Sequence, residues 1–157
     1  MNLLIQNDLK WKNEKLGKSK YTIGDSGCVI TSLCNCANLY GGDITPDELN
    51  RMLIDINGYT KDGDLYWNCA EKILNCKIQY KSWVKEEGIG KLNEILCNKR
   101  ISQKHQLICR YLNKNTQHFT NVLNVFSNYV IIYDVYDGKV KVLNKTDINR
   151  LVTVNFG

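Results

Sequence analysis

The sequence has no hydrophobic run long enough to cross a membrane and no segment with the features of a secretory signal. A helix that spans a bilayer needs about 20 consecutive apolar residues, so we expect a soluble protein. Residues 1–8 lack the basic segment and the long apolar run of a signal peptide, which predicts a cytoplasmic location. Release by cell lysis or transport on a phage particle is the alternative. No repeat or linker interrupts the 157 residues, so we expect a single domain over residues 1–157.

A disulfide framework and a metal-binding motif are also missing. The seven cysteines are an odd number without framework spacing, which favours free thiols in a reducing compartment. Cys34 and Cys36 would point to different sides of a helix, and no second pair has the spacing of a zinc site. Residues 22–27 lack the lysine and the glycine spacing of a phosphate-binding loop. We therefore expect no metal and no cofactor.

Positive charge is in excess, but it is dispersed. The formal net charge is +5 and the isoelectric point is about 8.8. The densest group of lysines lies near the N-terminus and consists of Lys10, Lys12, Lys15, Lys18 and Lys20. This group could attract an anionic polymer, although a solvated lysine face is the favoured interpretation. We expect neither nucleic acid nor a membrane as a partner.

The first half of the sequence is dominated by helical patterns. Apolar residues recur at helical spacing over residues 28–40, 45–56 and 65–74, and a fourth helix would carry Ile89, Leu92, Ile95 and Leu96. Thr45, Pro46 and Glu48 have the pattern of a capping box at the start of the second helix. Residues 3–5 are expected to form a short strand.

The second half is dominated by strand patterns. Strands are predicted over residues 77–84, 107–112, 118–123, 129–134, 139–143 and 152–156. Asp137 and Gly138 form a hairpin turn signal, and residues 146–151 are expected to form a helical turn. The order predicts an α+β fold in which N-terminal helices pack on a C-terminal antiparallel sheet.

Cys28 stands where a small-residue loop, residues 22–27, meets the first predicted helix. A thiol in the first turn of a helix faces unpaired backbone N–H groups and the positive end of the helix dipole, which favours the thiolate. Gly27 would let a substrate carbonyl approach the backbone. The helix would hold the cysteine rigidly by burying one face, formed by Val29, Ile30, Leu33, Ala37 and Tyr40. A core cysteine is the competing interpretation, and a base elsewhere must decide between them.

The chain offers two histidines as that base. His105 lies in a polar stretch and is expected in an exposed loop, whereas His118 opens an apolar strand and is the better candidate. Asp134 ends the next strand and can face His118 if the two strands are neighbours, where it would orient the imidazole. Gln6 is a neutral donor that an oxyanion hole could use, with a surface glutamine as the alternative.

Together these residues lie in strings that resemble a known family. The strings cover residues 6–11, 16–19, 21–32, 40–41, 44–50, 65–67 and 118–119. Their combination and order resemble the papain-like cysteine peptidases related to the bacteriocin double-glycine leader peptidase. The resemblance implies a papain-like fold with a cleft between the helix of Cys28 and the sheet. By position, it implies a nucleophile at Cys28, a base at His118, an orienting acid at Asp134 and an oxyanion donor at Gln6.

The sequence departs from this family at three places. Gln6 lies further ahead of Cys28 than in many relatives, so the intervening chain must fold outwards for the glutamine to return. Members usually follow the histidine with apolar residues and the aspartate with proline. Here Thr120-Asn121 and Val135 stand at those places.

We therefore predict a cysteine peptidase or amidase that hydrolyses a peptide or amide bond through a Cys28, His118 and Asp134 triad. It would be encoded by a phage or a bacterium and act on a peptide or on the stem peptide of peptidoglycan. Transfer of the acyl group to an amine would use the same triad. The alternative is a catalytically inactive papain-fold module that binds or inhibits a host partner.

Overall fold

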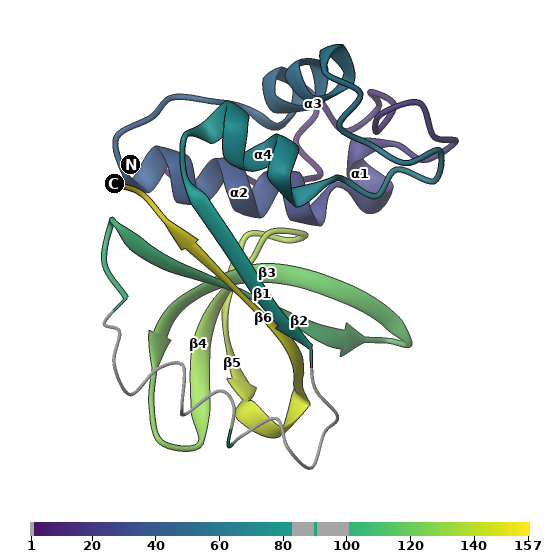
Figure 1. The fold of residues 1–157 in the computed structure, drawn as a ribbon. Helices are drawn as coiled ribbons and strands as arrows, with labels where there is room; N and C mark the ends of the chain where they lie inside the picture. The colour runs from purple at the N-terminus through teal and green to yellow at the C-terminus, as the bar shows by residue number, and fades with distance from the viewer. Residues whose placement is uncertain (1, 83–89, 91–100) are drawn as a thin grey trace.

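The computed structural model describes residues 2–82, 90 and 101–157, and Figure 1 shows a layer of helices above a sheet. The helices are α1 (Ile23–Ser26), α2 (Cys28–Leu39), α3 (Pro46–Asp55) and α4 (Trp67–Leu74). The strands are β1 (Lys77–Ser82), β2 (His105–Asn113), β3 (Thr116–Val125), β4 (Tyr129–Asp134), β5 (Lys139–Asn144) and β6 (Ile148–Asn155), and a short 3₁₀ helix, η1 (Lys145–Asp147), precedes β6. The predicted α+β architecture is confirmed.

The sheet has six strands in the order β1-β6-β2-β3-β4-β5, and every described pair is antiparallel. The C-terminal strand β6 lies between β1 and β2 and pairs with both, so β1 belongs to the same sheet as the later strands. β3 and β4 are neighbours, as the pairing of His118 with Asp134 requires. The predicted Asp137-Gly138 turn connects β4 to β5, and Gly138 has a φ of +72°, a conformation that glycine adopts without strain.

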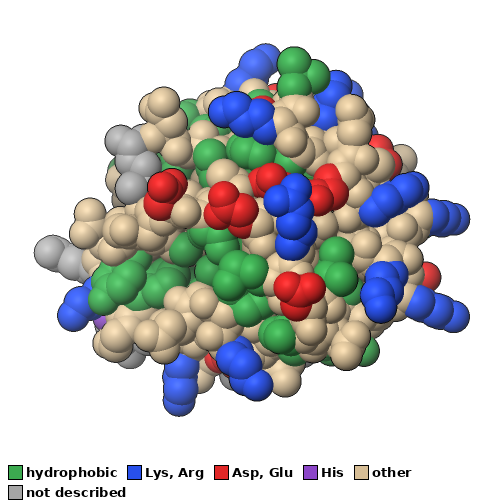
Figure 2. Space-filling model, turned by 90° about the horizontal axis from the view of Figure 1, so that it is seen from above, with side chains coloured by type: hydrophobic (Ala, Val, Ile, Leu, Met, Phe, Trp, Pro, Cys, Tyr) green, Lys and Arg blue, Asp and Glu red, His purple; other side chains and the backbone are tan. Residues whose placement is uncertain are grey.

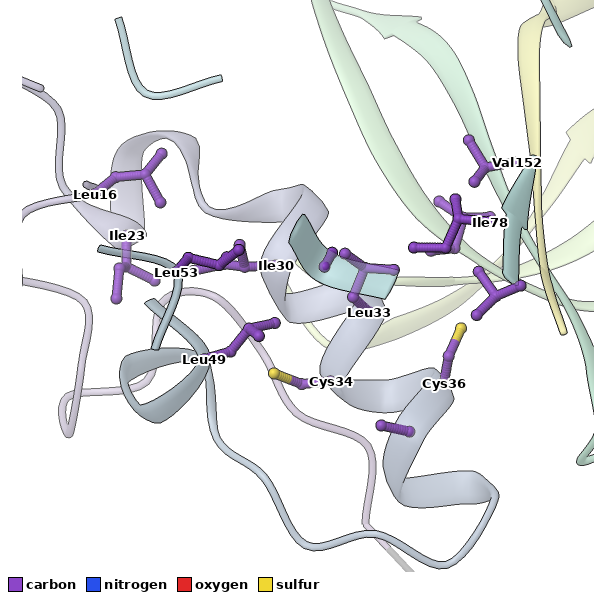
Figure 3. Packing of buried hydrophobic residues seen from close by; sticks show 14 of the residues in the cluster. Leu16, Ile23, Ile30, Leu33, Cys34, Cys36, Leu49, Leu53, Ile78 and Val152 are labelled. Atoms are coloured by element: carbon purple, nitrogen blue, oxygen red, sulfur yellow. The ribbon is translucent and has the colours of Figure 1, made fainter. Parts of the chain in front are cut away.

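Helix α2 is held between the sheet and the other helices by an apolar core. Its side chains reach both the strands on one side and α3 on the other, as Figure 3 shows. Each Leu or Ile that is fully buried contributes roughly 1.5–3 kcal/mol relative to an exposed one, which fixes the helix in place. The labelled members of this core are Leu16, Ile23, Ile30, Leu33, Cys34, Cys36, Leu49, Leu53, Ile78 and Val152.

Three predictions for the N-terminal half are wrong in detail. Residues 3–5 do not form a strand, and the Leu4 N–H donates instead to Asn35 Oδ1 on α2. The segment before Cys28 is the helix α1 rather than a loop, because Thr22 and Asp25 cap it reciprocally. Thr45 is the N-cap of α3, but it forms no capping box there, since its hydroxyl donates to the Asp47 carboxylate at 2.5 Å.

Two later predictions also change. Residues 148–151, predicted within a helical turn, belong to β6, because backbone pairing with β2 continues through them. The helical part of that segment is limited to η1. Apart from residue 90, the predicted helix around residues 89–96 lies outside the described residues, as do the last two residues of the predicted 77–84 strand.

Figure 2 views the molecule from the helical side. Acidic side chains lie across the middle of this face with a Lys or Arg side chain between them, and the other Lys and Arg side chains stand apart toward its edge. In the part of the chain that the structure describes, no helix has the length and apolar character needed to cross a bilayer.

Candidate active site

A cleft with a volume of about 910 Å³ is lined by residues from the helical layer and from the sheet. Cys28 comes from the start of α2, His118 from β3, Asp134 from the end of β4, and Gln6 from the N-terminal segment. The structure therefore brings into one cleft all four residues that the sequence singled out.

Cys28 is the first residue of α2, and only Gly27 separates α2 from α1. Its side chain is partly exposed, whereas Cys34 and Cys36 on the same helix are buried. The first N–H groups of a helix have no partner within the helix, and the helix dipole is positive at this end. Both effects stabilise negative charge at the sulfur of Cys28.

The sequence suggested that Gly27 lets a substrate carbonyl approach the backbone, but the structure gives a different reason for a glycine at this position. A Cβ at this position would lie 2.5 Å from the backbone oxygen of Ile23 and 2.7 Å from its Cγ2. The missing side chain therefore allows α1 to pack closely against the start of α2. It does not open the backbone to a substrate, because the Cβ position points into the protein rather than into the cleft.

His118 lies between Asp134 and Cys28. Its Nε2 is 2.8 Å from Asp134 Oδ1, so Nδ1 is the ring nitrogen left for Cys28. Burial by itself lowers the pKa of His118, but hydrogen bonds with Asp134 and Cys28 and the charges of both outweigh burial and raise it from 6.5 to about 9. The imidazole is therefore held in its protonated form around neutral pH.

Asp134 is almost fully buried and surrounded by donors. Lys141 Nζ lies 2.6 Å from Asp134 Oδ2, Tyr111 Oη donates to the same oxygen at 3.3 Å, and the Tyr136 N–H donates to Oδ1 at 2.9 Å. Burial raises the pKa of Asp134, but the hydrogen bonds from His118, Lys141 and Tyr136 outweigh it and hold the pKa well below its usual value. Asp134 is thus a fixed negative charge beside His118.

Sequence reasoning missed Lys141 and Tyr111. A signal for the lysine was present, because the Asp137-Gly138 turn sets the register in which Asp134 faces Lys139. Lys139 and Lys141 share one face of β5 since side chains alternate along a strand. The position of Tyr111 depends on the pairing of β2 with β3, where it lies opposite His118 and packs edge-on against its ring.

Gln6 returns to the cleft because both its backbone and its side chain are tied down. Its N–H donates to the Val135 oxygen at 2.7 Å, and its Nε2 donates to the Gly24 oxygen at 3.0 Å. The side chain is buried, which excludes the alternative of a surface glutamine. An amide group has two N–H donors, so one remains beyond the bond to Gly24.

The departures at Thr120 and Val135 form one connected arrangement. The Thr120 hydroxyl donates to the Tyr133 oxygen and accepts the N–H of Val135 at 3.2 Å. A proline after Asp134 would have no N–H, whereas the buried Val135 has one that needs an acceptor. The threonine supplies this acceptor, and the end of β4 keeps its position.

Asn121, the other departure, ties the sheet to α2. Its Nδ2 donates to the Ser32 oxygen at 3.1 Å, and its Oδ1 accepts from Asn35 Nδ2 at 2.9 Å. Asn35 also bonds the backbone of Leu4. The polar side chain is therefore satisfied inside the core and connects three segments around the cleft.

His105 does not line the cleft that holds Cys28, so it is not placed to act as its base. It is exposed at the start of β2 rather than in a loop, and its Nδ1 lies 2.7 Å from Asn155 Oδ1. Of the two histidines, only His118 lines the cleft.

We expect the stability of the protein to depend on His118 at alkaline pH. Because folding raises the pKa of His118 from 6.5 to about 9, its contribution is complete below pH 6.5 and is lost as the pH rises through 9. The contribution at low pH amounts to about 3 kcal/mol. Urea unfolding at pH 6 and pH 9.5 should show a larger loss of unfolding free energy for the wild type than for His118→Gln. Equal losses would contradict the prediction.

The helical layer, the antiparallel sheet and the cleft between them define the fold of a papain-like peptidase. A similar solved structure is the peptidase domain of Streptococcus ComA, a bi-functional ABC transporter involved in a quorum-sensing pathway. The TM-score is 0.56 and the identity 16%, and the match covers 83% of this chain and 91% of that domain. No protein-family model and no curated protein sequence matches the chain. The predicted fold and the family resemblance are thus confirmed at the level of the fold.

Proposed function

We propose that this protein is a cysteine peptidase in which Cys28 is the nucleophile, His118 the general base and acid, and Asp134 the orienting carboxylate. The observation that carries the proposal is the position of His118, whose Nε2 lies 2.8 Å from Asp134 Oδ1 and which lines one cleft together with Cys28. A nucleophile, a base within hydrogen-bond reach and a third group that orients the base are the parts that such catalysis needs.

The reaction follows from these positions. The Cys28 sulfur attacks the carbonyl carbon of the scissile amide, and the proton on His118 passes to the leaving amine as the C–N bond breaks. Water then gives a proton to His118 and attacks the thioester, which releases the acid and restores the Cys28 thiolate beside the protonated His118. Asp134 stays ionised throughout and keeps the imidazole in position.

The oxyanion would be held by two N–H groups. One is the backbone N–H of Cys28 at the start of α2, and the other is the second N–H of Gln6 Nε2. Gln6 Oε1 is buried without a partner among the described residues, so the amide is oriented by the bond from its nitrogen to Gly24.

Gln6→Ala is expected to lower kcat by about 10²–10³-fold with a smaller change in KM, because the donor acts on charge that develops in the transition state. The matched control is Gln79→Ala, which changes an exposed glutamine of β1. Steady-state kinetics on one fluorogenic peptide would measure both variants. A kcat loss no larger than that of Gln79→Ala would remove Gln6 from the oxyanion hole.

The proposed substrate is a peptide, either free or as the stem peptide of peptidoglycan. The cleft is lined by both layers, and its lining includes the aromatic side chains of Trp67 and Phe119 and charged side chains such as Asp64. Transfer of the acyl group to an amine in place of water would use the same residues.

A digest of a proteome-derived peptide library tests the proposal. Mass spectrometry should detect new peptide ends with the wild type and none above background with His118→Ala. Lys139→Ala, which removes an exposed cation of β5, serves as the control and should cleave like the wild type. The absence of cleavage by the wild type would favour the inactive binding module.

A further inference from the structure

The sheet wall of the cleft carries two arginines side by side. Arg110 of β2 lies directly opposite Arg150 of β6 in the strand register, and both line the cleft together with Cys28 and His118. Like charges directly opposite one another on neighbouring strands destabilise a sheet. Burial and the charge of Arg150 both lower the pKa of Arg110. An anion against the two guanidinium groups would turn this repulsion into attraction.

The Arg110 side chain is held in one orientation. Its Nε donates to Asn149 Oδ1 at 2.7 Å, and Asn149 in turn donates to Gln117 Oε1 at 2.9 Å. Its Cζ lies over the ring of Phe119, 5.8 Å from the centroid. These contacts use Nε and one face, and no other described residue donates to or accepts from the two terminal nitrogens, which can therefore meet an acceptor in the cleft.

No carboxylate of the described residues forms an ion pair with Arg110. The acidic residues of the cleft lie elsewhere: Asp25 and Asp64 belong to its helical wall, and Asp134 and Asp137 are paired with Lys141. Lys114, at the turn between β2 and β3, adds a further cation to the lining. The guanidinium of Arg110 is therefore available, among the described residues, to a ligand in the cleft.

Phe119 connects this charge to the reacting residues. It follows His118 directly in β3, packs against Arg110, and meets Trp67 edge-on with 6.1 Å between the ring centroids. A peptide that passes the sulfur of Cys28 and lies along the sheet wall would meet the arginines within a few residues of the scissile bond.

We propose that Arg110 and Arg150 bind the carboxylate of an Asp or Glu side chain in the peptide substrate. The inference rests on the proposed peptidase function, because a peptide is the ligand that the cleft would then take. A planar guanidinium with a pair of parallel N–H donors matches the two oxygens of a carboxylate. Arginine rather than lysine at position 110 supplies that geometry.

Cleavage profiling tests the specificity. Peptides cleaved by the wild type should be enriched in Asp or Glu at one fixed position relative to the cleaved bond. Arg110→Gln and Arg150→Gln should each lower this enrichment about tenfold, the usual effect of losing a charge-assisted hydrogen bond. Arg51→Gln, which removes an exposed arginine of α3 outside the cleft, should leave it unchanged. Cleavage without acidic enrichment, or with enrichment that survives Arg110→Gln, would overturn the inference and leave the peptidase function standing.

A binding measurement separates the two proposals if the library is not cleaved. The Cys28→Ala protein is titrated, at 150 mM salt, into fluorescein-labelled ten-residue peptides of alternating Ala and Glu or alternating Ala and Gln. The Glu peptide should bind about tenfold more tightly, and the difference should disappear in Arg110→Gln but persist in Arg51→Gln. That result would support the arginine site without peptidase activity, whereas equal affinities would overturn it.

The variant Arg110→Lys distinguishes geometry from charge. It keeps the cation but loses the paired donors, so acidic preference should fall to a value between those of the wild type and Arg110→Gln. Circular dichroism melting of each variant checks that the fold is retained. An Arg110→Lys preference as low as that of Arg110→Gln would point to the paired donors alone, and an unchanged preference would overturn the bidentate geometry.

Discussion

Cys28→Ala is expected to lower kcat/KM for a peptide substrate by at least about 10⁴-fold, which corresponds to roughly 5 kcal/mol of lost transition-state stabilisation. The reason is that in the proposed mechanism the sulfur forms the bond to the substrate carbonyl, and no other described thiol lines the cleft. The measurement is the initial rate of cleavage of a fluorogenic peptide chosen from the library digest, with protein purified separately for each variant.

The control for this prediction is Cys69→Ala. Cys69 is a partly exposed thiol of α4 that does not line the cleft, so its loss should change the rate by less than twofold or so. Thermal unfolding of both variants checks that the fold is intact. Residual activity of Cys28→Ala within tenfold of the wild type would show that Cys28 is not the nucleophile.

Alkylation by iodoacetamide at pH 6 should be fast and selective for Cys28, and His118→Ala should slow it about 100-fold. The thiolate is the reactive form, and a thiol with the ordinary pKa of about 8.5 is less than 1% ionised at this pH. With a pKa of about 9, His118 is protonated at pH 6 and can hold the sulfur as a thiolate. Mass spectrometry of tryptic peptides after timed labelling measures each cysteine separately and needs no substrate.

Cys69 is the internal reference for the alkylation rate. Its labelling should be slow at pH 6 and the same in the wild type and in His118→Ala. The buried thiols should stay unmodified, since burial raises the pKa of Cys109 to about 12 and also raises that of Cys34. If Cys28 reacted no faster than Cys69, the residue would be an ordinary thiol and the inactive binding module would be favoured.

The competing interpretation of Cys28 as a core residue can be judged from the other thiols. Cys34, Cys36 and Cys109 are fully buried, and Cys34 and Cys36 belong to the apolar core around α2. Cys28 lies on the same helix but at its open end, beside a protonated histidine. Cys28 thus differs from Cys34 and Cys36 in its place along α2, which leaves its thiol partly exposed in the cleft that His118 also lines.

Several features of the site follow from local sequence. A helix starts at Cys28, the strands that carry His118 and Asp134 lie on either side of one turn, and Asp137-Gly138 closes the next hairpin. These features depend on hydrophobic spacing and turn residues, which are properties of short stretches of chain. For this reason the fold class, and the place of Cys28, His118 and Asp134 in one cleft, could be predicted before the structure.

Only the tertiary structure decided the rest. The return of Gln6 to the cleft depends on a bond to Val135, the roles of Thr120 and Val135 depend on each other, and the pairing of Arg110 with Arg150 depends on β6 entering the sheet between β1 and β2. Each of these contacts joins residues that are far apart in the chain. Amino-acid composition and hydrophobic periodicity carry no information about which distant strands become neighbours. The sequence by itself determined a helix-borne cysteine and strand-borne partners, whereas long-range pairing determined how they meet and which charges surround them.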